Sequence, residues 1–93
     1  MTDDLMVLIN KAAEALKSFG ATEVYLFGSV ATGTNTKDSD IDLAVAGLPP
    51  ESFFEAMGRA EDILNDEIDL IDLDEQNPFT NYLKMKGNML RVA

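Results

Sequence analysis

Hydrophobic residues recur every three or four positions in the first twenty residues, a pattern that predicts an amphipathic helix. The positions that share one face of this helix are Leu5, Leu8, Ile9, Ala12, Ala13 and Leu16. Thr2 fits an N-cap, because two acidic residues follow it and acids stabilise the first turn of a helix. Gly20 is the predicted end of the helix, and we expect its apolar face to pack in the core.

Three short apolar runs predict β-strands, because they are rich in β-branched and aromatic residues and are bounded by turn-forming residues. They cover residues 23–27, 41–45 and 67–73. Side chains alternate between the two faces of a strand, so Asp69 in the third run should face away from Ile68. Residues 30–39, between the first two runs, are predicted to form a short helical turn followed by a loop.

Two further helices follow the second and third of these runs. Residues 51–64 come after a proline and end before Asn65, which fits a left-handed terminator. The predicted apolar face of this helix consists of Phe53, Phe54, Met57, Ala60 and Leu64. A last helix should begin at Asn77 and Pro78. The side chains that it should turn inward are those of Phe79, Tyr82 and Leu83.

The end of the chain has two interpretations. Gly87 is expected to end the last helix, which leaves residues 89–92 as a short edge strand; a helix that continues through Gly87 is the alternative. With the strand, the element order is α-β-β-α-β-α-β, which predicts an α/β (α+β) fold with helices packed on a small mixed sheet. The length suits one small domain, residues 1–93.

This element order brings polar residues from three strands to one edge of the sheet. The short link between the first two strands permits an antiparallel pair, and the long crossover between the second and third makes those two parallel. The end of the first strand, at Gly28 and Ser29, then lies beside the starts of the other two. The residues expected to gather at this edge are Ser29, Asp40, Asp42 and Asp69.

The charge of the chain excludes some partners. The sequence holds 17 acidic and 7 basic residues, for a net charge of -10. Nucleic acids bind Lys and Arg, so neither they nor anionic membranes are expected partners of this chain alone. Divalent cations or a basic protein would suit it, and a homo-oligomer is compatible with it. No secretory signal or membrane span is visible, and the absence of cysteine fits a cytoplasmic protein.

The same composition narrows the chemistry at the acidic edge. The chain has no cysteine and no histidine, so a metal site must use oxygen ligands. Three carboxylates without a nearby base would repel one another, and a divalent cation removes this conflict. Magnesium suits such a site because it keeps positions for water and substrate phosphates. With two ions bound, attack on the α-phosphorus of a nucleotide becomes feasible.

Each of these residues also has a simpler interpretation. Charged residues are usually solvated, so two aspartates at the start of a strand are most often an exposed edge. A Gly-Ser pair after a strand is commonly just a turn. Asp72 competes with Asp69 for the role of third carboxylate, but it should face the opposite side of its strand. The joint occurrence of these residues in a converging topology favours a site.

The pattern Gly28-Ser29, ten residues, then Asp40-Ile41-Asp42 resembles the GSx10DxD motif of the DNA polymerase β-like nucleotidyltransferases. The chain length and the IDLIDL run resemble the minimal nucleotidyltransferases, or MNT proteins, of this superfamily. The resemblance implies the nucleotidyltransferase fold, with ATP as substrate and its phosphates held by Gly28 and Ser29. It also implies two Mg²⁺ ions, and metal binding and catalysis by Asp40, Asp42 and Asp69.

Small MNT proteins are often antitoxins paired with a HEPN-domain toxin, and some transfer AMP to a tyrosine of that toxin. The resemblance therefore implies a protein adenylyltransferase with a HEPN toxin as its partner. The sequence departs from the family at Val30 and Thr32, where a GSRARG segment carries arginines. A second hypothesis follows: an antitoxin with weakened chemistry that neutralises its partner by forming a complex. A third is a nucleotide-binding subunit of a larger transferase.

Overall fold

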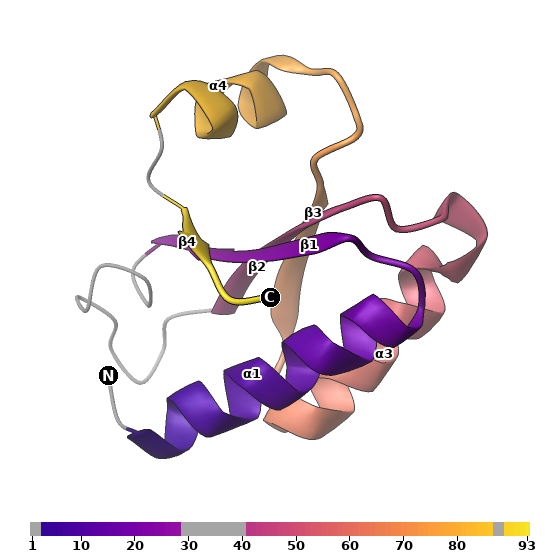
Figure 1. Cartoon of the computed structure of the whole chain (residues 1–93), viewed down its shortest axis with the longest axis vertical. Helices are drawn as coiled ribbons and strands as arrows, with labels where there is room; N and C mark the ends of the chain where they lie inside the picture. The colour runs from indigo at the N-terminus through magenta and orange to yellow at the C-terminus, as the bar shows by residue number, and fades with distance from the viewer. Residues whose placement is uncertain (1–2, 29–40, 87–88) are drawn as a thin grey trace.

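The computed structural model describes residues 3–28, 41–86 and 89–93. Two helices cover one face of a four-stranded sheet, α1 (Asp3–Ser18) and α3 (Phe53–Leu64). A third helix, α4 (Pro78–Lys86), lies over the other face (Figure 1). The strands are β1 (Glu23–Phe27), β2 (Ile41–Ala46), β3 (Ile68–Asp72) and β4 (Leu90–Arg91), in the spatial order β3-β2-β1-β4. The predicted mixed α/β fold is confirmed.

The pairing of the strands follows the predicted topology. β1 and β2 are antiparallel, with Phe27 opposite Asp42, and β2 and β3 are parallel, with Asp42 opposite Asp69. β4 pairs antiparallel with β1 at the edge of the sheet, as the edge-strand interpretation predicted. Residues 87 and 88 lie outside the described part of the chain, and with them the predicted helix end at Gly87.

The main core lies between the sheet and the layer of α1 and α3. Its fully buried side chains include Ile9, Leu16, Val24, Leu26, Leu43 and Val45. The predicted apolar face of α1 is confirmed, because its four central positions are fully buried and Leu5 and Leu8 pack against them. The N-cap predicted at Thr2 falls outside the described residues. In these residues, no helix has the length and apolar character needed to cross a membrane.

The start of α3 differs from the prediction. Residues Pro50–Ser52 form a short 3-10 turn and the α-helix begins at Phe53, whereas Asn65 ends it in the predicted left-handed conformation, with φ 54°. Phe54 is wrongly predicted as buried, since 76% of its surface is exposed. Neighbouring helical residues point about 100° apart, so Phe53 packs on the core while Phe54 points outward and contacts the Phe53 ring edge-on, at 5.6 Å between centroids.

The start of α4 is fixed by a reciprocal cap. The Asn77 side-chain oxygen accepts a 2.9 Å hydrogen bond from the Thr80 backbone N–H, and the Thr80 hydroxyl accepts one from the Asn77 N–H. The same hydroxyl donates to the Glu75 carbonyl oxygen at 2.6 Å, so the buried Thr80 is fully used. Such caps satisfy backbone donors that a helix start leaves unpaired. The predicted start at Asn77 and Pro78 is confirmed.

Only part of the predicted inner face of α4 is buried. Leu83 packs with Phe27, Ala44 and Leu73 in a second apolar cluster. Phe79 contacts the Phe27 ring edge-on, at 6.3 Å between centroids, yet remains 48% exposed. Tyr82 is 55% exposed, so its predicted burial is wrong. A nine-residue helix lying on one layer of sheet can bury only one narrow face.

Candidate active site

The site predicted from the sequence has two of its carboxylates on neighbouring strands. Asp42 opens β2 and Asp69 opens β3, and the two residues are register partners in the parallel pair. Parallel strands lie about 4.8 Å apart. Both side chains project from the sheet face that α4 covers, because Asp42 alternates with Leu43 and Asp69 with Ile68 and Leu70, whose side chains pack in the main core. The predicted convergence of these two aspartates is confirmed.

Gly28 supplies the turn that closes β1 beside Asp42. Its φ is +76°, a conformation that residues with a Cβ rarely adopt. A Cβ built on Gly28 would collide with Oδ2 of Asp42 and would lie 3.2 Å from its Cγ. Glycine is therefore required twice here, by the backbone conformation and by the carboxylate that lies against it. The backbone of Gly28 and the carboxylate of Asp42 therefore lie directly against each other.

Two of the predicted site residues fall outside the described part of the chain. Ser29 and Asp40 belong to residues 29–40, as do the predicted helical turn and loop between β1 and β2. Ser29 directly follows Gly28, and Asp40 directly precedes Ile41. Their predicted roles in phosphate and metal binding therefore remain predictions.

Asp72, the competitor of Asp69, lies elsewhere on β3. It pairs in register with Val45, a core residue under α1 and α3, so its side chain leaves the opposite sheet face from Asp69. Its Oδ1 atom accepts a 2.9 Å hydrogen bond from the Asp74 backbone N–H. In turn, Asp74 Oδ2 accepts a 2.7 Å hydrogen bond from the Gly47 N–H. These two aspartates hold the turn after β3.

The pair of Asp42 and Asp69 fits a hard divalent cation. Both side chains are carboxylates, the donor type that magnesium takes in proteins, and the absence of a side chain at Gly28 leaves space for the Asp42 carboxylate. Within the described residues, no group of three or more acidic, His or Cys side chains is placed to hold a metal. Asp40, the predicted third carboxylate, lies outside that part of the chain.

A cluster of apolar side chains lies next to the carboxylates of Asp42 and Asp69. Phe27, the register partner of Asp42, is buried under α4 together with Ala44 and Leu83. Phe79, at the start of α4, covers the edge of the Phe27 ring. The carboxylates of Asp42 and Asp69 therefore lie between this apolar cluster and the solvent. Helix α4 covers the apolar cluster.

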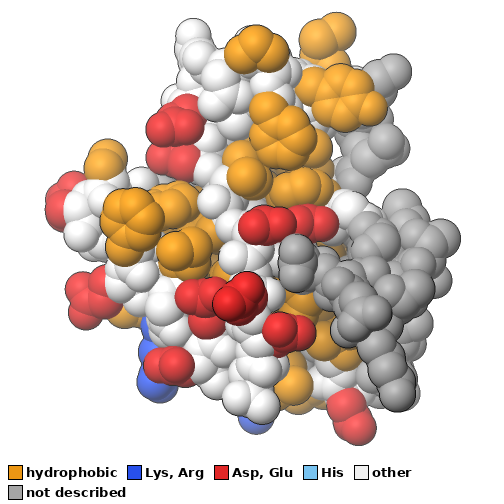
Figure 2. All heavy atoms as spheres, turned by 180° about the vertical axis from the view of Figure 1, so that it is seen from behind, with side chains coloured by type: hydrophobic (Ala, Val, Ile, Leu, Met, Phe, Trp, Pro, Cys, Tyr) orange, Lys and Arg blue, Asp and Glu red, His pale blue; other side chains and the backbone are white. Residues whose placement is uncertain are grey.

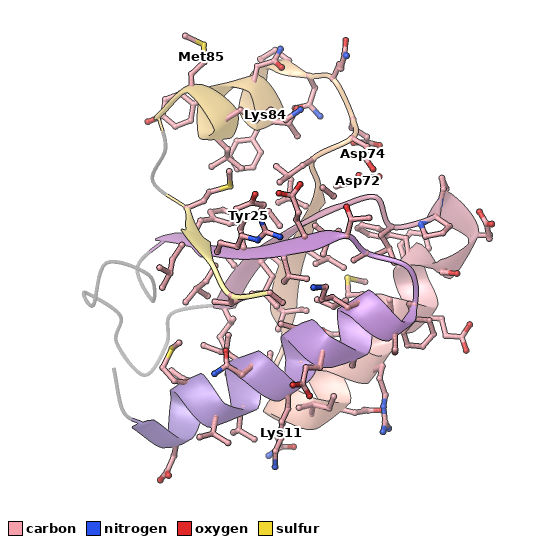
Figure 3. All side chains as sticks on the ribbon, viewed as in Figure 1. Lys11, Tyr25, Asp72, Asp74, Lys84 and Met85 are labelled. Atoms are coloured by element: carbon pink, nitrogen blue, oxygen red, sulfur yellow. The ribbon has the colours of Figure 1, made fainter. Side chains whose placement is uncertain are left out.

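Sequence reasoning missed a second feature on the same sheet face. A cleft of about 480 Å³ is lined by Glu23, Tyr25, Ala46, Leu73, Asp74, Lys84 and Met89. Figure 3 shows Tyr25 on β1, Asp74 after β3 and Lys84 on α4 around the space between the helix and the sheet. The alternation of residues 23–27 places Tyr25 on the face of Phe27, but the helix that forms the other wall could not be positioned from the sequence.

Tyr25 belongs to a polar cluster inside this cleft. Its hydroxyl donates a 2.8 Å hydrogen bond to Oε1 of Glu23, and the same oxygen lies 3.3 Å from Nη1 of Arg91 on β4. The hydrogen bond to Glu23 raises the pKa of Tyr25 above its ordinary value of 10.0. Burial and the negative charge of Glu23 act in the same direction, and Arg91 opposes them. The cluster ties β4 to β1.

Comparison with known proteins agrees with this geometry. The family model described as polymerase β nucleotidyltransferase matches residues 4–91. Among curated proteins, none matches the sequence significantly. A toxin–antitoxin complex with AMP-PNP is similar in structure, with a TM-score of 0.74 and 26% identity over 90% of this chain and 71% of that one.

Two further solved structures have the same fold. A protein assigned as a minimal nucleotidyltransferase gives a TM-score of 0.69 and 26% identity over 88% of this chain and 90% of that one. A complex of a tri-AMPylated HEPN toxin with an MNT antitoxin from Shewanella oneidensis gives 0.69 and 21%, over 96% and 71%. At the latter identity the likeness concerns the fold alone.

Proposed function

Because the chain belongs to the polymerase β nucleotidyltransferase family, we propose that it is a magnesium-dependent adenylyltransferase. In this proposal, residues 1–93 form one minimal nucleotidyltransferase domain that transfers AMP from ATP to a tyrosine hydroxyl of a HEPN toxin and so acts as its antitoxin. The observation that carries the proposal is the register pairing of Asp42 with Asp69 beside the Gly28 turn. A solvated strand edge would not require glycine against one of its carboxylates.

Two of the similar structures support the substrate and the partner. One is a toxin–antitoxin complex that contains AMP-PNP, an analogue of ATP, and it shares 26% identity with this chain. The other, which at 21% identity shares only the fold with this chain, contains a HEPN toxin that carries AMP groups. The acidic charge of this chain, -10, suits a basic protein partner such as a ribonuclease.

The proposed reaction is a displacement at the α-phosphorus of ATP. The acceptor oxygen forms a bond to the α-phosphorus, the bond from that phosphorus to the bridging oxygen of the β-phosphate breaks, and pyrophosphate leaves. Gly28 and Ser29 would hold the phosphates through the backbone of their turn. Asp69 would take the proton of the attacking hydroxyl. Its solvent-exposed position is one that a protein acceptor can approach.

Asp40, Asp42 and Asp69 would hold magnesium in this proposal. When bound, the metal supplies positive charge that stabilises the triphosphate and lowers the pKa of the attacking hydroxyl. The carboxylates would also align the nucleotide with the acceptor, because they are fixed at the starts of two paired strands. Holding reactants in such an alignment can supply several kcal/mol of the rate enhancement, roughly 7–11 in the best cases.

The second candidate function is an antitoxin that acts by binding alone, with weak chemistry. It rests on Val30 and Thr32, which stand where related motifs carry arginines, and on Lys37, the one base between Gly28 and Asp42. A triphosphate with less cationic help binds less tightly. In this candidate the partner is silenced by the complex, and AMP transfer contributes little.

Co-expression of the chain with its HEPN partner separates the two functions. The partner is purified and weighed intact, with Asp69→Asn as the test variant and Asp72→Asn as the matched control from the same strand. The adenylyltransferase proposal expects AMP-sized mass increments with the wild type and Asp72→Asn, and none with Asp69→Asn. An unmodified partner that the wild type still neutralises would favour binding alone.

A further inference from the structure

The outer edge of β3 is an open side of the sheet. β3 comes first in the strand order β3-β2-β1-β4, so no strand within the described residues pairs with its outer side. The Leu73 N–H donates to the Val45 carbonyl oxygen of β2 at 2.8 Å, and backbone groups alternate between the two sides of a strand, so those of Leu70 face outward. The Ile68 N–H also faces outward and donates to Oε2 of Glu61 at 3.3 Å. An open edge of this kind can hydrogen-bond to a further extended chain.

A groove that contains two phenylalanines lies beside this edge, between β3 and the start of α3. Its volume is about 370 Å³. The described residues that line it are Pro50, Phe53, Phe54, Leu70, Asp72 and Glu75. Seen from behind, hydrophobic side chains gather over the start of α3, with acidic side chains around them (Figure 2). The groove can therefore receive an apolar side chain from a chain that lies along β3.

Acidic residues dominate this edge of the sheet. Residues 66–75, which contain β3 and the turns around it, include six acidic residues and no basic one. The Asp72 carboxylate accepts a hydrogen bond from the Asp74 N–H within the turn, whereas the Glu75 side chain is exposed at the groove and can meet a positive charge from outside. A chain that adds to β3 must therefore bring basic residues, as the basic partner of the proposed function would.

Acids on an edge strand can also serve only to prevent association. A second copy of this chain is disfavoured in that way, because it would bring the same six acids against those of β3, and like charges on paired strands destabilise the pair. A purely protective edge, however, gains nothing from an exposed aromatic ring beside it, and Phe54 lies in the groove with most of its surface exposed. Charge thus disfavours pairing between two copies and favours a basic segment.

We propose that the outer edge of β3 and the groove of Phe54 bind an extended basic segment of the protein that accepts the nucleotidyl group, as an added strand. The inference rests on the proposed function. Backbone hydrogen bonds to Leu70 hold the segment, one of its apolar side chains fills the groove, and a lysine or arginine faces Glu75. Neighbouring strands lie about 4.8 Å apart, so the segment lies directly beside Asp69 of β3, the proposed acceptor of the hydroxyl proton.

A pair of aspartate substitutions at exposed apolar positions tests the groove. Phe54→Asp places a charge in it, and Val7→Asp does the same on α1, where Val7 is 51% exposed. Phe54 lies in the first turn of α3, where an acid is favourable, so the variant should fold. We expect Phe54→Asp to weaken binding of the purified HEPN partner by at least about tenfold, and Val7→Asp to bind as the wild type does. Equal binding by Phe54→Asp and the wild type overturns the proposal.

Charge reversal tests the basic character of the segment. Glu75→Lys and Glu14→Lys change the net charge by the same amount, and both glutamates are exposed, the first at the groove and the second on α1. Glu75→Lys should weaken the complex with the HEPN partner, and Glu14→Lys should weaken it much less. Equal affinities of these two variants would show that only the overall charge matters, which overturns the proposed position.

Amide hydrogen exchange reports the added strand itself. Exchange of the Leu70 N–H should slow when the HEPN partner binds, because this N–H enters a hydrogen bond with the added segment. Exchange that stays unchanged in the saturated complex overturns strand addition. The chain alone is measured as well, over a range of concentrations. A dimer in which the same N–H is protected would assign the edge to self-association and would also overturn the proposal.

Failure of the docking proposal and failure of the proposed function give different results. A complex that protects the Leu70 N–H, in which the partner gains no AMP from the wild type, refutes the proposed chemistry and supports the docking edge. AMP transfer without this protection refutes the docking edge and supports the chemistry. Asp42→Asn should abolish AMP transfer and keep the wild-type affinity, because Asp42 lies on β2, away from the outer edge of β3.

Discussion

Asp42 and Asp69 are register partners at the starts of two parallel strands, and both project from the sheet face that α4 covers. Neither strand would place an acid there for packing, since Asp is disfavoured in strands. The antiparallel pairing of β1 adds the Gly28 turn to the same corner. One corner of the sheet thus combines two carboxylates on neighbouring strands with a glycine whose backbone lies against one of them.

Replacing Asp69 should remove the proposed acceptor of the hydroxyl proton. We expect Asp69→Asn to lower the rate of AMP transfer by roughly 10²–10⁴-fold, the range that general bases contribute. Its effect on the melting temperature should be small, because Asp69 is exposed. The rate is measured with purified partner and ATP. Asp72→Asn is the control. An equal loss of transfer rate in that variant would mean that the sheet face on which the aspartate lies does not matter for transfer.

Gly28 should not tolerate alanine. Gly28→Ala introduces a Cβ at positive φ and against the Asp42 carboxylate, and a loss of roughly 1–3 kcal/mol in the free energy of unfolding is expected from backbone strain. Gly58→Ala is the matched control, since a Cβ there meets no atom within 4 Å. It lies inside α3 and should stabilise the protein by about 0.5–1 kcal/mol. Urea unfolding of both variants measures the difference.

The pKa of Tyr25 can be read directly once Tyr82, the other tyrosine of the chain, is replaced. In Tyr82→Phe, absorbance at alkaline pH should report a midpoint above 10.0, and adding Glu23→Gln should lower it, because the Glu23 carboxylate is the main cause of the shift. A folded-state pKa above the unfolded value stabilises the protein fully below pH 10.0. This stability is lost as the pH rises through the folded-state pKa. A midpoint unaffected by Glu23→Gln would contradict the assignment.

The cap of α4 should be measurable by a single substitution. Asn77→Ala removes the side-chain oxygen that accepts from the Thr80 N–H and should lower the free energy of unfolding by about 1 kcal/mol. Asn81→Ala is the control, because Asn81 is exposed within the same helix and alanine favours helices. Thermal unfolding followed by circular dichroism compares them. Equal melting temperatures would show that the cap contributes nothing.

The sequence was most informative where local rules and topology agreed. The bounds of β1 and the left-handed Asn65 follow from turn residues alone. The pairing of Asp42 with Asp69 follows from the lengths of the connections, since a short link permits an antiparallel pair and a crossover makes a parallel one. Strand alternation then predicted that Asp69, and not Asp72, shares a sheet face with Asp42.

Other features depend on tertiary packing that no local pattern specifies. Phe54 follows the partly buried Phe53, and Tyr82 precedes the buried Leu83; apolar character alone did not reveal that Phe54 and Tyr82 face solvent. The placement of α4 over the sheet depends on contacts between distant residues, such as Phe79 with Phe27. For this reason the cleft beside Tyr25 and the groove beside β3 became visible only in three dimensions.

Transfer of label from ATP tests the central claim most directly. Purified chain and HEPN partner are incubated with magnesium and ATP labelled on either the α- or the γ-phosphate, using the wild type and Asp42→Asn. We predict that the α-label becomes covalently attached to the partner, that the γ-label does not, and that Asp42→Asn transfers neither. Attachment of the γ-label, or equal transfer of the α-label by Asp42→Asn, would contradict adenylylation at the corner formed by Gly28, Asp42 and Asp69.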